Sequence, residues 1–156
     1  MSEKAGVSPG YLYRYYNNKE ELVQQLVESI VEDMKKNFLS KIDTAVNAYE
    51  AIYEYVQFLH EQANLDPIRA NFITAVALDV KVPLIEKKEN YKEIIEISQS
   101  FINLAGKKKE FNPEVTAKEV ALVLFTIPYR NIALSLDEDK NKKFTKEETK
   151  RITEIC

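Results

Sequence analysis

Apolar residues recur at helical spacing along most of the chain. The pattern is clearest between residues 18 and 39, where an apolar side chain stands at every fourth position and so falls on one face of a helix. Asn18 precedes this stretch as an N-cap, and Glu21 stands where it completes a capping box. The pattern therefore predicts a long amphipathic helix with a stripe of Leu22, Leu26, Ile30 and Met34.

Five further helices are indicated by the same spacing and by residues that favour helix starts. Asp66-Pro67 and Asn112-Pro113 each place a capping side chain before a proline, which fits the first helical turn. Thr145 with Glu148 forms a second capping box and starts the last helix. The expected helices span about 44–63, 67–79, 84–105, 113–136 and 145–156.

Two residues should end or bend these helices. Gly106 is a left-handed terminator for the helix before it, and Pro128 should kink its helix or end it near Ile127. The run VALVLFTIP around that proline is apolar on nearly every face, so it needs cover from its own domain and from another chain. No segment alternates at strand period, and the expected fold class is all-α.

Composition agrees with a globular chain of one domain. The 156 residues are 45% hydrophobic and 30% charged, and only three glycines and five prolines argue against a turn-rich β architecture. No apolar run approaches the roughly 20 residues that cross a bilayer, so no membrane partner is expected. The single cysteine, Cys156, forms no internal disulfide, and we expect a cytoplasmic protein.

The first residues carry a different pattern. Ser8-Pro9 is a cap and first-turn signal that predicts a short helix over about 9–16, preceded by a glycine turn. A short helix between a tight turn and a long helix is the second half of a helix-turn-helix. Through Lys19 this segment carries three basic residues against one acidic residue, although the whole chain has a net charge of -3. The segment can therefore face an anion.

The stretch AGVSPGYLYRYYNNKEEL resembles the recognition-helix signature of the TetR family of bacterial transcriptional regulators. That signature reads AGVS-x-G-x-LY-x-YF-x-x-K-x-x-L, and Tyr16 stands where Phe is common. The resemblance implies a homodimer that places the short helix in the major groove of a double-stranded DNA operator. It also implies a helical-bundle domain that binds a small-molecule effector, with the dimer interface on the last two helices, about 113–156.

The start of the short helix would lie closest to the phosphates. A helix N-terminus at Ser8 and Pro9 offers free N–H groups and the positive end of the helix dipole. Gly10 lets the helix approach DNA closely. By analogy with the family, Tyr13 and Lys19 would contact phosphates.

The remaining residues of the short helix divide between two faces. Tyr11, Arg14 and Tyr15 share the outward side, and the resemblance assigns them to base edges or nearby sugars. Leu12 and Tyr16 are four residues apart and should pack inward. The alternative for the tyrosines is a role in covering a core.

The TetR signature is normally preceded by a full helix and most of a second, and only four residues stand before AGVS here. We therefore expect an N-terminally truncated regulator with an incomplete helix-turn-helix domain over 1–38 and an effector and dimerisation domain over 39–156. Such a chain should bind DNA poorly, which a gel shift against an extended version tests. The alternative is a helical small-molecule sensor or dimerisation module that does not bind DNA.

The effector site has no sequence motif. Pockets in helical bundles are mostly apolar with a few polar groups, so aromatic residues of the helical body are candidates, although each could equally be core. His60, the only histidine, could sense pH or hold a ligand, and Arg130 could meet an anionic effector. The candidates are Tyr49, Tyr53, Phe58, His60, Phe72, Tyr91, Phe101, Phe125, Tyr129 and Arg130.

Nothing in the sequence favours an enzyme. The chain has no Gly-rich phosphate loop, and a lone His with a terminal Cys suggests no nucleophile-base pair. Without a second His or a nearby Cys we expect no metal site, and no cofactor is expected.

Overall fold

The computed structural model describes residues 18–78, 88–108, 112 and 114–156, and all regular structure in these residues is helical. The expected all-α fold class is confirmed. The helices are α2 (Lys19–Thr44), α3 (Ala48–Leu65), α4 (Pro67–Leu78), α5 (Lys88–Lys108), α6 (Ala117–Glu138) and α7 (Lys146–Ile155).

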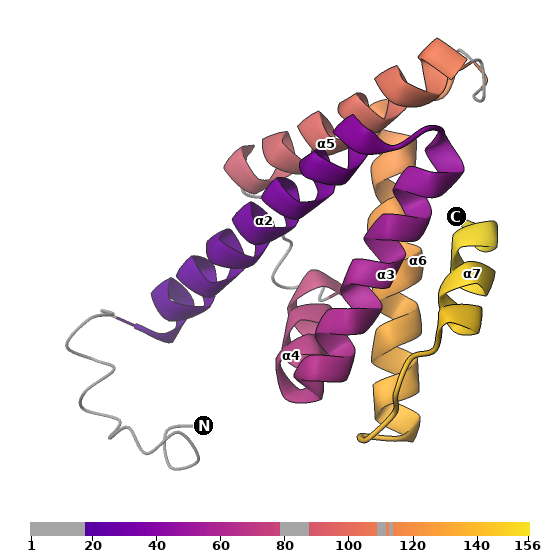
Figure 1. Cartoon of the computed structure of the whole chain (residues 1–156). Helices are drawn as coiled ribbons and strands as arrows, with labels where there is room; N and C mark the ends of the chain where they lie inside the picture. Colours follow the sequence, from indigo (N-terminus) through magenta and orange to yellow (C-terminus); the bar gives the residue numbers. More distant parts are fainter. Residues whose placement is uncertain (1–17, 79–87, 109–111, 113) are drawn as a thin grey trace.

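Helix α3 lies at the centre of the bundle and contacts α2, α4, α5, α6 and α7. Figure 1 shows α2 and α5 side by side at one end of the bundle, with α6 running beside α3 and α7 packed against both. Helix α4 packs against α6 and also touches α2. The bundle is therefore built so that α2, α3, α4 and α6 approach one another around one region.

Helix α2 begins where the sequence predicts. The Asn18 side chain accepts a hydrogen bond of 2.7 Å from the backbone N–H of Glu21. The helix then runs to Thr44, beyond the predicted end, because Phe38 and Ile42 are buried in the core. The next helix was predicted to start at about residue 44, directly after Asp43, and this predicted start is therefore wrong.

Helix α3 begins instead at Ala48, with Asn47 as its N-cap. The Asn47 side chain accepts a hydrogen bond of 2.8 Å from the backbone N–H of Glu50. The predicted start of α4 is confirmed, since it begins at Pro67 and the Asp66 side chain accepts from the N–H of Arg69 at 2.9 Å.

The ends of α5 and the start of α6 differ from the sequence prediction. Gly106 does not terminate α5, which continues to Lys108. Helix α6 begins at Ala117 rather than after Asn112-Pro113, because Thr116 and Glu119 form a reciprocal capping box that satisfies two helix-terminal N–H groups. At this helix start, the capping box of Thr116 and Glu119 is a stronger signal than the single capping side chain of Asn112 followed by proline.

Helix α6 passes through Pro128 and continues to Glu138, so the predicted end near Ile127 is wrong, and the predicted kink stays a prediction. Pro128 is buried, and the packing of α6 on α3, α4, α5 and α7 offsets the missing backbone hydrogen bond. The capping box of Thr145 and Glu148 at the start of α7 is confirmed.

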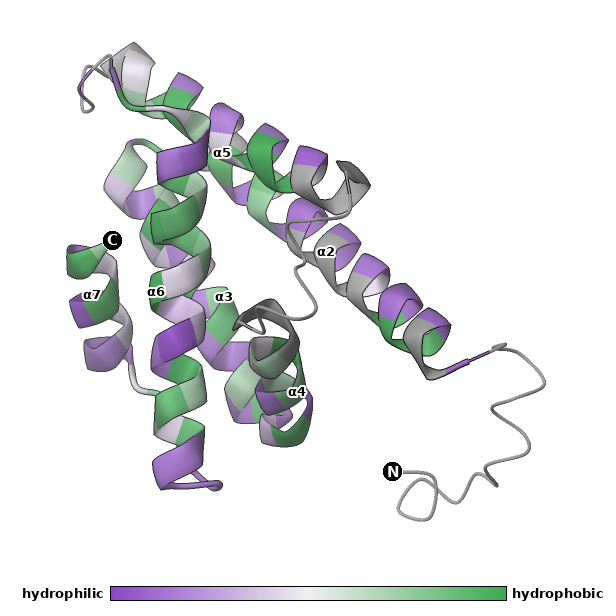
Figure 2. Cartoon of the chain, turned by 180° about the vertical axis from the view of Figure 1, so that it is seen from behind, coloured by the Kyte–Doolittle hydropathy of each residue, from purple (hydrophilic) through white to green (hydrophobic). Residues whose placement is uncertain are grey.

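Helix α6 is long and apolar enough to cross a membrane by length and composition alone, with a mean hydropathy of 1.3 over an 18-residue window. Core helices of bundles share this composition, and α6 packs on α3, α4, α5 and α7. In Figure 2, green apolar stretches of α6 lie on either side of a purple hydrophilic stretch. Leu122 and Leu134 remain 53% and 49% exposed.

Candidate functional site

A cavity of about 300 Å³ lies where α2, α3, α4 and α6 approach one another. Most of its wall is apolar, with Phe58 and Leu59 from α3, Ala70 and Ile73 from α4, and Ile132 from α6. Its volume is at the lower end of the usual range for small-molecule sites. The polar lining consists of Asp33, Asn37, Gln62, Arg69, Thr74 and Tyr129.

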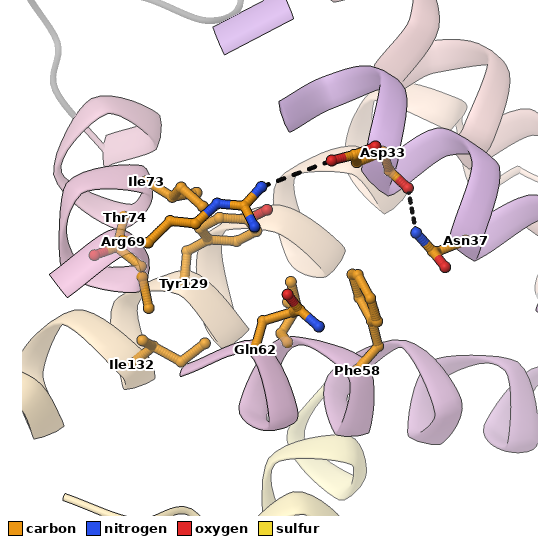
Figure 3. Close-up of a pocket in the computed structure, with 11 residues that line it drawn as sticks. Asp33, Asn37, Phe58, Gln62, Arg69, Ile73, Thr74, Tyr129 and Ile132 are labelled. Carbon is orange, nitrogen blue, oxygen red and sulfur yellow. Dashed lines mark hydrogen bonds and ion pairs between the residues drawn. The ribbon is translucent and has the colours of Figure 1, made fainter. Parts of the chain in front are cut away.

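The two charged lining residues form an ion pair at the exposed edge of the cavity. The Arg69 guanidinium on α4 lies 3.6 Å from the Asp33 carboxylate on α2, and both side chains are at least half exposed. Figure 3 shows the Arg69 guanidinium and the Tyr129 hydroxyl on the side of the cavity that faces α2. The cavity therefore has a charged opening and an apolar interior.

A chain of aromatic rings supports the wall that Tyr129 forms. The Phe38 and Tyr55 ring centroids are 4.6 Å apart, those of Tyr55 and Phe125 are 6.0 Å apart, and Phe125 stacks on Tyr129 at 6.5 Å. Burial raises the pKa of both tyrosines, so both hydroxyls stay protonated. The Tyr55 hydroxyl is buried and makes no well-formed hydrogen bond, although Tyr129 lies close enough to contribute to its raised pKa.

The structure brings two of the predicted effector residues, Phe58 and Tyr129, to this cavity. Phe101 lines a second apolar cavity of about 320 Å³ between α3, α5 and α6, with Cys156 at its wall. Burial raises the pKa of the Cys156 thiol to about 11, so the thiol stays protonated at neutral pH. Phe125 lies in the aromatic chain behind Tyr129.

The other predicted effector residues lie elsewhere. Tyr49 and Arg130 are exposed, and Tyr53 and Phe72 are half-buried outside both cavities. The side chain of Tyr91 lies outside the described residues. Sequence reasoning missed Asp33 and Arg69, because charged residues on an amphipathic helix carry no signal that distinguishes a cavity opening from solvated surface.

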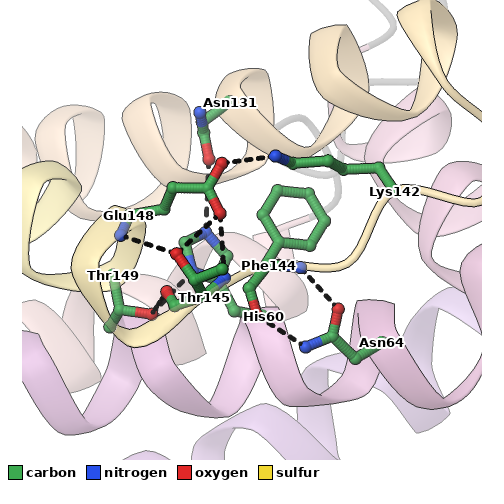
Figure 4. Close-up of polar contacts among 8 residues, drawn as sticks. All are labelled: His60, Asn64, Asn131, Lys142, Phe144, Thr145, Glu148 and Thr149. Carbon is green, nitrogen blue, oxygen red and sulfur yellow. Dashed lines mark hydrogen bonds and ion pairs between the residues drawn. The ribbon is translucent and has the colours of Figure 1, made fainter.

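His60 is 2% exposed and joins three helices, and it lines neither of these two cavities. Its Nδ1 lies 2.9 Å from the Thr149 hydroxyl on α7, and its Nε2 lies 3.2 Å from the Asn131 side-chain oxygen on α6. The Phe144 ring stacks on the imidazole at 4.5 Å, and Figure 4 shows these contacts. Burial lowers the pKa of His60, so the neutral ring is favoured.

The predicted DNA-contacting residues Ser8, Pro9, Gly10, Tyr11, Tyr13, Arg14 and Tyr15 lie outside the described residues, as does the side chain of Lys19. Their segment leads directly into α2, which begins at Lys19. Helix α2 therefore connects the predicted DNA-binding segment to the cavity that Asp33 and Asn37 line.

Known proteins resemble this chain both in the N-terminal segment and in the helical bundle. Residues 2–26 match the family model described as "Bacterial regulatory proteins, tetR family", and the match ends within the first turns of α2. The fold is similar to that in "Structural analysis of fatty acid degradation regulator FadR from Bacillus halodurans", with a TM-score of 0.68 and 19% sequence identity over 99% of this chain and 80% of that chain. The comparison with curated protein sequences gives no match. The resemblance to the TetR family is thereby confirmed over residues 2–26.

Proposed function

We propose that the chain is a TetR-like transcriptional repressor whose binding to operator DNA is relieved by a small-molecule effector. One observation carries this proposal: the segment that matches the family runs into α2, and α2 forms one wall of the cavity. A ligand in that cavity touches the helix that continues from the DNA-binding segment. Effector binding can therefore change the position of that segment.

The effector is proposed to be a small, largely apolar molecule that fills the cavity between α2, α3, α4 and α6. The apolar wall and the volume of about 300 Å³ support this choice. The similar structure is described as a regulator of fatty acid degradation, which is compatible with an apolar effector here.

The regulator is proposed to act as a homodimer through residues 113–156. Leu122 and Leu134 on α6 and Ile155 on α7 remain exposed on this part of the chain, and exposed leucines on a core helix favour a partner. A two-fold interface of this kind is expected to bury about 1,200–2,000 Å².

Selection of DNA duplexes from a random pool by the purified protein tests DNA binding. The experiment uses the chain itself and a version extended at the N-terminus by the upstream reading frame. We expect the extended version to enrich a two-fold symmetric sequence more strongly than the chain itself, because a dimer reads two equivalent half-sites. Failure of both versions to enrich any sequence would refute DNA binding and would favour a sensor module without it.

Arg14→Ala tests the predicted reading of base edges. In an anisotropy titration with the selected duplex, we expect this change to weaken binding by about 1–3 kcal/mol, the usual contribution of a base-contacting arginine. Lys92→Ala, which removes an exposed cation on α5 outside residues 113–156, is the control. Equal losses from both changes would mean that Arg14 acts only through overall charge.

Native mass spectrometry of the purified protein tests the effector cavity. We expect a co-purifying small molecule, or an added one, to bind the wild-type chain and not Ile73→Trp, which fills the cavity with an indole. Ile68→Trp is the control, because Ile68 is exposed on the same helix and does not line the cavity. Retention of the molecule by Ile73→Trp would place the effector elsewhere.

A further inference from the structure

We propose that the ion pair between Asp33 and Arg69 is a latch between α2 and α4, and that an amphipathic carboxylate opens it by taking the place of Asp33 on Arg69. The proposal rests on the proposed function, because it names the effector class and the regulation of the same cavity. In this exchange, the carboxylate of the ligand replaces the carboxylate of Asp33 as the partner of the Arg69 guanidinium.

Arg69 and the surrounding wall define the ligand class. The guanidinium stands at the opening of a cavity whose interior is formed by Phe58, Ile73 and Ile132. A guanidinium donates two parallel hydrogen bonds to a carboxylate, which suits it to recognise that group. The Tyr129 hydroxyl is protonated and lines the same cavity. A carboxylate head at the opening and an alkyl chain inside match this arrangement.

The existing ion pair is easily exchanged. The Arg69 and Asp33 groups are 3.6 Å apart, and their side chains are 50% and 61% exposed. Ion pairs of that length and exposure contribute little to stability. A ligand carboxylate forms an equivalent pair and adds burial of its alkyl chain against the cavity wall, so the exchange is favourable.

The exchange changes the contacts of α2, because one residue of the ion pair lies on that helix. Asp33 belongs to α2 and Arg69 to α4, so the ion pair links these two helices. Helix α2 continues from the N-terminal segment, and α4 forms the opposite wall of the cavity. Lys35 pairs with Glu96 on α5 at 3.2 Å, and this contact lies outside the cavity. Opening the latch would therefore remove this polar link between α2 and α4 while α2 stays packed on α5.

Isothermal titration calorimetry with sodium octanoate and with 1-octanol, at low ionic strength, tests the ligand class. The two probes share the same alkyl chain and differ in charge. For the wild-type chain we expect octanoate to bind at least about tenfold more tightly than octanol, as charge-assisted hydrogen bonding implies. Arg69→Met should remove the preference, and Arg130→Met, an exposed arginine outside the cavity, should keep it.

Asp33→Asn tests the exchange itself. Because this change removes the competing carboxylate, octanoate should bind about two- to fivefold more tightly while octanol affinity stays the same. Unchanged octanoate affinity would overturn the latch. Circular dichroism confirms that each variant is folded.

Hydrogen exchange of the α2 backbone amides around Asp33 tests the regulation. We expect faster exchange with octanoate than with octanol, and an already raised rate in Asp33→Asn. Equal binding of octanoate and octanol, or a preference that survives Arg69→Met, would overturn this inference and leave the proposed effector cavity intact. Absence of binding by either probe would overturn both.

Discussion

His60 shows how one buried residue determines the response of the bundle to pH. Its ring contacts Thr149 on α7 and Asn131 on α6 from its own position on α3. Burial is the largest cause of its lowered pKa, and the hydrogen bond to Asn131 and the nearby Glu148 carboxylate offset only part of that effect. The native state therefore favours a neutral ring, while the unfolded chain titrates normally.

We expect the free energy of unfolding to fall on acidification because of His60. Its native pKa lies below the ordinary value of 6.5, so the unfolded state binds more protons in that range. The contribution is complete above about pH 6.5 and is lost as the pH falls through the native pKa, with a slope below about 1.4 kcal/mol per pH unit. Urea unfolding between pH 7.5 and 5.5 measures the slope.

His60→Gln is the comparison, because glutamine keeps hydrogen-bonding capacity and does not titrate. This variant should be less stable at pH 7.5 and should show a flatter slope. Glu148 does not interfere, since its pKa is lowered to about 2 by Lys142 and it stays ionised throughout this range. Equal slopes in both proteins would mean that His60 is not the titrating group.

At the scale of elements, local capping chemistry predicted some helix starts and missed others. Asn18, Asp66 and Thr145 stand at starts that the structure confirms. Asn47 and Thr116 were missed, because two capping signals lay close together in each case and packing decided between them. The continuation of α2 depends on burial that no local pattern reveals.

Thr145→Ala measures the value of the capping box at α7. The Thr145 side chain accepts from the Glu148 N–H, and the Glu148 carboxylate accepts from the Thr145 N–H at 2.8 Å. Losing the threonine hydroxyl should lower the free energy of unfolding by about 1 kcal/mol. Lys146→Ala, an exposed neighbour, should change it little. An unchanged midpoint in urea for Thr145→Ala would contradict the role of the cap.

Leu122→Glu tests the proposed dimer. Placing a charge on the exposed apolar face of α6 should convert a dimer to a monomer at micromolar concentration, because a buried unpaired carboxylate is costly at an interface. Leu65→Glu is the matched control, since Leu65 is 79% exposed at the end of α3, outside residues 113–156. Sedimentation velocity gives the oligomeric state. A wild-type monomer, or a Leu122→Glu dimer, would refute this interface.

At the scale of the whole molecule, the sequence predicted the fold class and the family resemblance but not the cavity. Periodicity identifies helices, and a contiguous motif identifies the N-terminal segment. The cavity instead combines residues from four helices, and Asp33 and Arg69 meet only after α2 and α4 have packed. Phe58 and Tyr129 were among the predicted aromatic residues, yet nothing in the sequence separated them from Tyr49.

The central claim is that filling the cavity between α2, α3, α4 and α6 weakens DNA binding through α2. Ile73→Trp fills that cavity without requiring knowledge of the effector, and Ile68→Trp adds the same side chain at an exposed position of α4. The most direct measurement is an anisotropy titration of the selected duplex with each variant, all made in the extended version. We expect Ile73→Trp to bind the duplex at least about tenfold more weakly than Ile68→Trp and the wild type, which is within the usual range of allosteric coupling. Equal affinities for all three proteins would contradict the claim.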